Sequence, residues 1–496
     1  SACEDLFEPA KENNRGVEEM LTDPNYAVGL LGYGYAMLPY ENTSVSDVAT
    51  DDAVTNDKES NYSKMALGSW ASNNNPMEQW QARKAAIQYL NTFLSIVDQV
   101  SWAKNEVTNK MFIDKLSGEA YGLRALNYYY LLMAHGGWTE DGKLLGVPML
   151  LEPESTTSDF NQARAPFSEC VQQIFEDLEL ASELLPLDYE NIDSDAEVPA
   201  KYKEIGAQLG NYNLVFGTYQ RGRLTMRIVE AIKAQVALLA ASPAYREGSE
   251  VTSETAANYA AAVLNRIGGV TGLDPKGHTW YMNTEELDNL GSGEVSAEIL
   301  WRVNKSIGTE DWDMGIKQEK DNFPPTFYGS GRINPTQNLV DAFPMANGYP
   351  IADKANSGYS ENAPYTGRDP RLEKYILFNG AEFKDKTIIT GLYPDEDNKE
   401  NGYSTRTGYY LRKLLREDCN ANPNSLNAKY HIPVRIRYTE IFLAYAEAAN
   451  DAWGPTGKGG NAYSAYDVIK AIRVRGGVET DNGDAYLESV KGDKDK

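Results

Sequence analysis

Several segments far apart in the chain repeat apolar residues at helical spacing, and this pattern constrains the fold more than any other feature. Residues 78–100 place Ile87, Leu90, Leu94 and Val97 three or four positions apart, and residues 117–134 repeat the pattern. Such spacing gathers apolar side chains on one face of a helix, which must pack against another element. We therefore expect a mainly α chain built from helices that cover one another.

Five further segments are amphipathic in the same way; they are residues 168–185, 227–241, 254–267, 433–450 and 462–475. In the second of them, Ala231, Ala234, Ala237 and Ala241 recur at contact spacing, which lets two helix axes approach closely. The last two are joined by the breaker-rich residues 454–460 and predict a helical hairpin. Two helices within about 40 residues match the size of a tetratricopeptide-like unit, so we expect tetratricopeptide-like hairpins to form the scaffold.

Residues 268–429 differ from the rest because Gly, Pro, Asn, Asp and aromatic residues dominate them. Only short runs such as 298–303 and 372–378 have the character of strands. We expect a large irregular region of loops and short strands, where a helical scaffold would carry a binding site. The predicted organisation is one domain with a tether (1–16), a helical scaffold with inserted loops (17–267), the irregular region (268–429), and a C-terminal helical hairpin and tail (430–496).

Net charge excludes one class of partner. The chain carries 47 Lys and Arg against 72 Asp and Glu, a formal charge of −25. Such a surface repels phosphate backbones and anionic headgroups, so nucleic-acid binding is not expected. The most apolar segment, residues 228–241, is interrupted by Glu230 and Lys233, and no run reaches the roughly 18 apolar residues of a membrane-spanning helix.

Motifs for common catalytic chemistry are absent from the sequence. There is no GxSxG elbow and no GxxxxGK[ST] loop, and the three histidines, His135, His278 and His431, lie far apart without an HExxH setting. The acidic run 395–402 is similar to a calcium loop but places Lys399 at a ligand position, so we interpret it as a solvated turn. We predict no enzyme activity, metal or cofactor, although abundant carboxylates leave a glycoside hydrolase open.

Aromatic residues are in excess, with 32 Tyr and 8 Trp, and several fall in predicted loops. Flat apolar rings beside amide and carboxylate groups suit the faces and hydroxyls of sugars, and they suit an extended peptide as well. The alternative is that the rings fill a core that lacks regular elements. The candidate ligand-binding residues are Trp70, Asn73, Asn74, Trp280, Tyr281, Trp312 and Tyr328.

Cys3 stands apart from Cys170 and Cys419 because Ser-Ala-Cys opens the chain and Glu4-Asp5 follow directly. This arrangement is typical of a lipoprotein cut near its acceptor cysteine, where a lipid would anchor the mature protein. The alternative is an ordinary thiol. No CxxC spacing occurs, so the sequence predicts neither a zinc site nor a disulfide framework, and whether Cys170 and Cys419 pair stays open.

A series of stretches, in order along most of the chain, resembles the SusD/RagB family of outer-membrane nutrient-binding lipoproteins of Bacteroidetes. The stretches are residues 119–130 with His135-Gly136-Gly137, 222–225 leading to 241–245, 335–348, 368–372, 408–413, 437–450 and 471–477. Most of these residues look like scaffold; Arg368-Asp369-Pro370, for example, would fix a turn, because proline restricts the residue before it. One departure is the C-terminus, where family members continue into a basic, aromatic helix and this chain has the polar residues 483–496. Either the sequence is truncated, or a terminal element that normally packs on the scaffold is missing or replaced.

The resemblance implies four tetratricopeptide-like hairpins that support a loop-rich face, with lipid at Cys3 anchoring the protein to the outer membrane at the cell surface. It also implies pairing with a SusC-type TonB-dependent barrel, over which the protein closes as a lid and delivers its ligand unaltered. Oligosaccharides are the first ligand hypothesis and oligopeptides the second. A surface glycoside hydrolase and an interaction module without its own ligand are the remaining alternatives.

Overall fold

The predicted helices are present in the computed structural model, and their ends are set by local caps. The structure describes residues 19, 23–39, 44–69, 75, 77–155, 157–158, 161–303, 309–391, 395, 397–398, 404–479 and 481–496. Backbone contacts divide the chain into two units. Unit 1 comprises residues 1–39 and 78–263, and unit 2 comprises residues 40–77 and 264–496. The first unit is helical and the second is largely irregular, while the expectation of a single domain stays a prediction.

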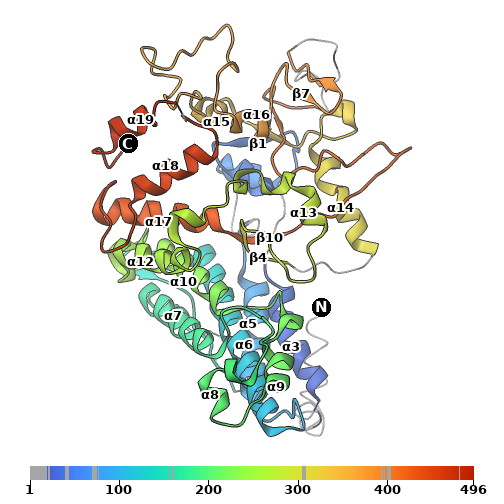
Figure 1. Cartoon of the computed structure of the whole chain (residues 1–496), viewed down its shortest axis with the longest axis vertical. Coiled ribbons are helices and arrows are strands. Elements are labelled where there is room, and N and C mark those ends of the chain that lie inside the picture. The colour runs from blue at the N-terminus through green and yellow to red at the C-terminus, as the bar shows by residue number, and fades with distance from the viewer. Residues whose placement is uncertain are drawn as a thin grey trace. The chain divides into compact units, whose positions relative to one another are not determined.

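Unit 1 is assembled around one long helix, α6 (Glu106–His135), which contacts α3, α5, α7, α9 and α10 (Figure 1). Asn105 caps the start of α6 by accepting a hydrogen bond from the Thr108 N–H at 3.0 Å, and Gly136 follows the last residue of the helix. The other elements are α3 (Pro24–Ala36), α5 (Trp80–Ile96), β2 (Gly137–Trp138), β3 (Leu144–Leu145), α7 (Phe167–Leu184), α8 (Ala200–Lys203), α9 (Leu209–Phe216), α10 (Met226–Ala241), α11 (Arg246–Ser249) and α12 (Ser253–Asn265), whose last two residues belong to unit 2.

Small residues let the helices of unit 1 pack closely. The four alanines predicted at a contact face of α10 are all buried, at 0–3% exposure. On α6, a Cβ at Gly122 would come within 2.8 Å of Leu224, and one at Gly118 within 2.8 Å of Leu185. Larger side chains at these positions would push neighbouring elements off α6, so the close approach depends on these glycines.

Within its described residues, unit 2 contains four two-stranded antiparallel pairings rather than one large sheet. The pairs are β1 (Ala53–Thr55) with β5 (Ile333–Pro335), β4 (Ile299–Arg302) with β10 (Val434–Arg437), β6 (Ile376–Leu377) with β9 (Tyr410–Leu411), and β7 (Glu382–Phe383) with β8 (Lys386–Thr387), and β2 with β3 is the fifth, in unit 1. The first pair, with Ala53 opposite Pro335, ties residues 40–77 to unit 2.

Helices frame these pairs. They are α4 (Asn61–Ala66), α13 (Thr284–Asp288), α14 (Thr309–Asn322), α15 (Gln337–Ala342), α16 (Arg371–Tyr375), α17 (Tyr438–Trp453), α18 (Ala465–Arg475) and α19 (Ala485–Val490), with the 3-10 turns η1 (Ser44–Ala49), η4 (Gly269–Gly272), η5 (Gly277–Met282) and η6 (Pro325–Phe327). The predicted hairpin of α17 and α18 is confirmed, and a capping box between Ser464 and Asp467 begins its second helix.

Four sequence expectations for unit 2 are wrong. The region expected to hold only loops and short strands contains the 14-residue helix α14, and residues 372–378 form the end of α16 before β6. Residues 434–437 of the expected helix 433–450 are strand β10. Asp397 of the expected solvated turn is fully buried, because it accepts hydrogen bonds from the Thr326 N–H and hydroxyl and pairs with Lys386 at 3.1 Å.

Cys170 and Cys419 are free thiols, and each is buried. Across the described helices, none combines the length and apolar character needed to cross a membrane.

His278 in unit 2 makes the fold sensitive to acid. Burial lowers the pKa of its imidazole to about 4, helped by the positive charges of Lys374, Arg475 and Arg371. Its Nδ1 is buried and has no hydrogen-bond partner among the described residues. Below about pH 6.5 the unfolded chain takes up a proton that the folded chain refuses, so stability falls as the pH drops from about 6.5 towards 4.

We expect His278→Gln to remove an acid-dependent loss of about 2–3 kcal/mol in the free energy of unfolding. Urea denaturation of both proteins at about pH 8 and about pH 4.5 measures this loss. The values at pH 8, where the imidazole is neutral in both states, report any packing cost of the substitution alone. Equal losses in the two proteins between these pH values would contradict the assignment.

Candidate functional site

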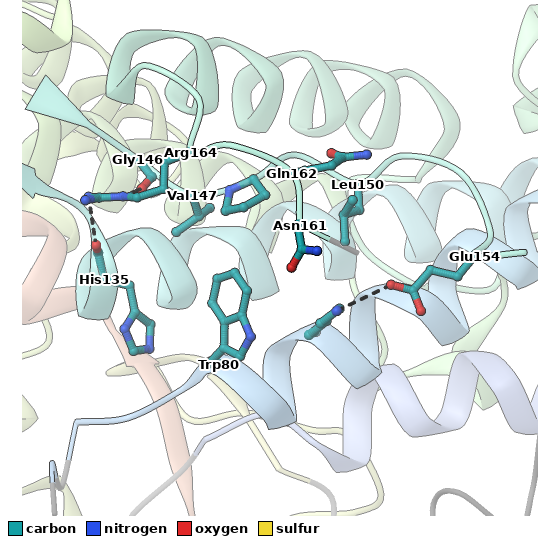
Figure 2. Close-up of a pocket in the computed structure, with 11 residues that line it drawn as sticks. Trp80, His135, Gly146, Val147, Leu150, Glu154, Asn161, Gln162 and Arg164 are labelled. Atoms are coloured by element: carbon teal, nitrogen blue, oxygen red, sulfur yellow. Dashed lines mark hydrogen bonds and ion pairs between the residues drawn. The ribbon is translucent and has the colours of Figure 1, made fainter. Parts of the chain in front are cut away.

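A pocket of about 550 Å³ opens in unit 1, between the start of α5, the end of α6 and the segment that follows β3 (Figure 2). This volume lies within the about 300–1,000 Å³ of small-molecule sites. Its lining combines one indole, the segment from Gly146 to Pro148, and amide and charged side chains; the residues are Trp80, Lys84, His135, Gly146, Val147, Pro148, Leu150, Glu154, Asn161, Gln162 and Arg164. An aromatic face beside several polar groups is the composition expected of a sugar-binding site.

Trp80 gives the pocket its apolar face. It is the first residue of α5, its side chain is 37% exposed, and its ring meets that of His135 edge to face with centroids 6.1 Å apart. Figure 2 shows the indole standing between His135 and Asn161. An exposed indole held in place by a neighbouring ring is suited to stack on a flat ligand ring.

His135, the last residue of α6, is fixed by the start of α5. The Gln79 N–H donates to its Nε2 at 3.1 Å, so a neutral imidazole carries its proton on Nδ1. Burial lowers the pKa of His135, the charge of Arg164 lowers it further, and Glu78 opposes both. The ring is therefore neutral at pH 7, and its Nδ1–H is a hydrogen-bond donor without an acceptor among the described residues.

The wall opposite α5 is held by hydrogen bonds from α5 and α6 to its backbone. The Tyr128 hydroxyl donates to the Leu150 carbonyl at 2.7 Å and accepts from the Leu150 N–H at 2.6 Å. Asn91 donates to the carbonyls of Leu150 and Glu152, at 2.9 and 3.2 Å. Because these partners lie on the two helices that frame the pocket, the wall is shaped before any ligand arrives.

Arg124 joins this wall to the core of unit 1. Its Nε and Nη2 bind both carboxylate oxygens of Asp177 at 2.8 Å, while Nη1 reaches Asn91 at 3.0 Å and the Leu151 carbonyl at 3.3 Å. Burial acts to lower the pKa of Arg124, but the hydrogen bonds and charge of Asp177 raise it overall. One buried guanidinium thus holds α5, α6, α7 and the pocket wall together.

The described residues that line the pocket carry more positive than negative charge. Lys84 pairs with Glu154 at 3.5 Å, and both side chains are about a third exposed (30% and 31%). Arg164 instead donates through Nε to the Gly146 carbonyl at 2.8 Å and through Nη2 to the carbonyls of Leu145 and His135, at 3.1 and 3.2 Å (Figure 2). Carbonyl oxygens orient the guanidinium but do not neutralise it, so the described lining residues carry one more positive than negative charge.

Of the candidate residues from the sequence, none of the described ones lines this pocket. Trp70, Asn73, Asn74 and Cys3 lie outside the described residues. Trp312 lies in α14, but its side chain is outside the described part of the structure, and Tyr328 is 55% exposed in unit 2 with a left-handed backbone (φ 65°). A ligand role for these residues stays a prediction.

The expectation that Trp280 and Tyr281 are exposed for ligand binding is wrong. They were expected on a loop where packing does not need them, but they are only 8% and 6% exposed within a core cluster that includes Ile299 and Leu287. The two rings meet edge to face, with centroids 5.9 Å apart. Their faces are covered by the protein itself, so neither ring is available to stack on a ligand.

Sequence reasoning missed the residues that do form the pocket. Trp80 continues the apolar face of α5, seven residues before Ile87, and so has the pattern of a core residue. Arg164 and Asn161 lie in a segment without periodicity, and His135 belongs to no HExxH motif. No group of three or more His, Cys, Asp or Glu within the described residues is arranged to hold a metal ion.

Comparisons with known proteins agree with one another. A model of the SusD family matches residues 297–494, and a model described as "Starch-binding associating with outer membrane" matches residues 16–202. A search of curated proteins finds no match.

Similar solved structures include a SusD-like protein from Bacteroides fragilis, with a TM-score of 0.66 at 20% identity over 95% of this chain and 83% of that chain. A SusD-like carbohydrate-binding protein from the same species gives 0.65 at 17% identity, over 95% and 83% of the two chains. A laminarin-binding SusD-like protein gives 0.56 at 18% identity, over 95% and 92%. At these identities the structures show a shared fold. With two family models over most of the sequence and this mainly α fold, the chain belongs to the SusD/RagB family.

Proposed function

We propose that this protein captures oligosaccharides at the cell surface and delivers them to a SusC-type TonB-dependent transporter in the outer membrane. Family membership supports the general role, since one matching model is described as starch-binding and associating with the outer membrane. Structurally similar proteins described as carbohydrate-binding or laminarin-binding support a glycan rather than a peptide as ligand. Attachment to the membrane through lipid at Cys3 is part of this proposal.

The observation that carries the proposal is the pocket around Trp80. It offers an exposed indole, a wall fixed by hydrogen bonds, and several outward polar groups within about 550 Å³. Sugar rings need both a flat apolar face for their C–H groups and polar partners for their hydroxyls. A pre-shaped wall lowers the ordering cost of binding, which favours recognition without a large rearrangement.

Binding without catalysis fits the same pocket. Among the described residues that line it, Glu154 is the single carboxylate, and Lys84 pairs with it at 3.5 Å. Hydrolysis of a glycosidic bond ordinarily needs two carboxyl groups on opposite sides of the bond. We therefore propose that the ligand leaves unchanged, and release of reducing ends by the purified protein would overturn this part of the proposal.

We expect Trp80→Ala to weaken glycan binding about five- to tenfold, because a stacking ring is worth roughly 1–1.5 kcal/mol. Affinity gel electrophoresis on gels that contain starch, β-1,3-glucan, xylan or polygalacturonate measures the retardation of the wild-type protein and the variant. Trp138→Ala is the matched control, because Trp138 is a 47% exposed indole of the same unit that does not line the pocket. Equal retardation of wild type and Trp80→Ala on every gel would count against the pocket as the glycan site.

The transporter half of the proposal has its own test. Solubilised native membranes should yield the protein together with a TonB-dependent barrel, and mass spectrometry should identify saccharide bound to the complex. Peptide in place of saccharide would favour the oligopeptide alternative. Recovery of the protein without any barrel would count against delivery.

A further inference from the structure

The described residues that line the pocket around Trp80 carry a net positive charge, on a protein whose own net charge is −25. Among these residues Lys84 and Arg164 are positive, Glu154 is negative, and His135 is neutral at pH 7. We propose that this pocket selects acidic oligosaccharides, binding the carboxylate of a uronic acid residue while the sugar ring lies against Trp80. The inference rests on the proposed function and adds the chemical class of the ligand.

Arg164 is the group that would bind the carboxylate. Its Nε and Nη2 are used by three backbone carbonyls, those of Gly146, Leu145 and His135, at 2.8–3.2 Å. These bonds fix the plane of the guanidinium, and Nη1 is left without an acceptor among the described residues. A guanidinium held in place with a free N–H and no carboxylate partner is ready for an anionic ligand, and its charge makes that hydrogen bond stronger than a neutral one.

The other charges of the pocket do not cancel Arg164. Glu154 is the only carboxylate among the described lining residues, and its charge is offset by Lys84 at 3.5 Å. Glu78, outside the lining, lies 4.0 Å from His135 Nε2 and is 46% exposed, so solvent screens it. A ligand carboxylate therefore meets a net attraction in the pocket, although the protein surface as a whole repels anions.

Two neighbouring groups would select a sugar over a free anion. The indole of Trp80 supplies a face for the ring, and the His135 Nδ1–H supplies a neutral donor for a ring hydroxyl. Burial and Arg164 lower the pKa of His135, so this donor does not become a second cation at neutral pH. The carboxylate and the ring are thus recognised by different side chains within one cavity (Figure 2).

The test uses pairs of oligosaccharides that differ only in charge. Oligogalacturonates, glucuronic-acid-substituted xylan fragments and hyaluronan fragments are each compared with their carboxyl-reduced, neutral forms by isothermal titration calorimetry on the full chain. We expect at least one acidic member to bind about tenfold more tightly than its neutral partner, because a hydrogen bond to a charged group is stronger than one between neutral groups. Raising NaCl from about 0.05 to about 0.5 M should reduce that preference and leave neutral binding unchanged.

Variants separate charge from shape. Arg164→Gln should bring acidic and neutral partners to equal affinity, Arg164→Lys should retain part of the preference because it keeps the charge, and Trp80→Ala should weaken both forms. Lys143→Gln is the control, because this lysine is 71% exposed and lies outside the lining. The calorimetry and salt series on wild-type protein keep the test valid if Arg164→Gln fails to fold.

The outcomes distinguish this inference from the function beneath it. Equal binding of acidic and neutral forms, lost in Trp80→Ala, would overturn the acid preference and leave glycan capture standing. Binding of acidic peptides with no saccharide bound would overturn the acid-sugar assignment in favour of the peptide alternative. Absence of binding to every saccharide, acidic or neutral, would overturn both proposals.

Discussion

Replacing Asp177 with asparagine is expected to lower the free energy of unfolding by about 3–5 kcal/mol, because among the described residues Asp177 is the one carboxylate that pairs with the buried guanidinium of Arg124. The side chains of Arg124 and Asp177 are 7% and 1% exposed, and both arginine nitrogens that face the carboxylate lie 2.8 Å from it. Arginine cannot shed its proton to relieve the loss. Burial raises the pKa of the Asp177 carboxyl, although hydrogen bonds from Arg124 oppose the rise, so the carboxylate depends on this pair.

Asp177→Asn should also weaken glycan binding in the pocket. Arg124 also donates to Asn91 and to the Leu151 carbonyl, and Asn91 in turn holds the backbone at Leu150 and Glu152. If the guanidinium moves, the wall opposite Trp80 loses its shape, and we expect glycan affinity to fall about tenfold or more.

Urea denaturation followed by circular dichroism measures the stability of Asp177→Asn, and affinity gels measure its binding. Glu176→Gln is the matched control: it removes a carboxylate from the adjacent, exposed position of α7 and should change stability by less than about 0.5 kcal/mol. A loss of less than about 1 kcal/mol in Asp177→Asn would contradict the role given to the pair.

Glu298→Gln should have an effect of similar size in unit 2, about 3–5 kcal/mol in the free energy of unfolding. The Glu298 side chain is fully buried; Arg437 lies 3.1 Å from its Oε1 and Arg475, only 4% exposed, lies 3.6 Å from its Oε2. Without the carboxylate, two guanidinium groups would face each other with no counterion between them. Their mutual repulsion and buried charge are the source of the expected loss.

The Glu298 carboxylate also binds the first turn of α17. Its Oε1 accepts hydrogen bonds from the Thr439 N–H at 3.2 Å and the Thr439 hydroxyl at 2.5 Å, and a negative charge at a helix N-terminus is favourable. Glutamine keeps an oxygen for these bonds but removes the charge, so the variant isolates the electrostatic part.

Denaturation of Glu298→Gln alongside Glu285→Gln provides the measurement, since Glu285 is exposed on α13 and its loss should be nearly neutral. Glu298→Gln should still bind glycan through Trp80 under conditions in which unit 1 remains folded. Equal stability of the two variants would show that the pairing of Glu298 with Arg437 and Arg475 does not stabilise unit 2.

The sequence predicted well where the physical signal was local. Helix α10 was predicted at residues 227–241 and spans Met226–Ala241, and α7, predicted at 168–185, spans Phe167–Leu184. Apolar spacing, an N-cap at Thr225 and glycines after α6 are short-range signals that each helix carries within itself. Strand β4 was anticipated within 298–303 for the same reason.

The errors arose where burial depended on distant residues. Trp280 and Tyr281 were expected on an open loop, but Ile299, Leu287 and Ile432 cover them in unit 2. Asp397 was expected in solvent, but Thr326 and Lys386 bind it. Aromatic content alone does not tell whether a ring faces a ligand or another part of the chain.

By itself the sequence determined the helical scaffold, the irregular region and membership of a family, because periodicity and ordered motifs are written along the chain. Only the tertiary structure decided which side chains share a cavity. Trp80, His135 and Arg164 are up to 84 positions apart, and they meet because buried Arg124, Asn91 and Tyr128 hold one loop against two helices. A site made by such long-range hydrogen bonds leaves no local pattern, since each residue taken alone has the surroundings of an ordinary core or surface position.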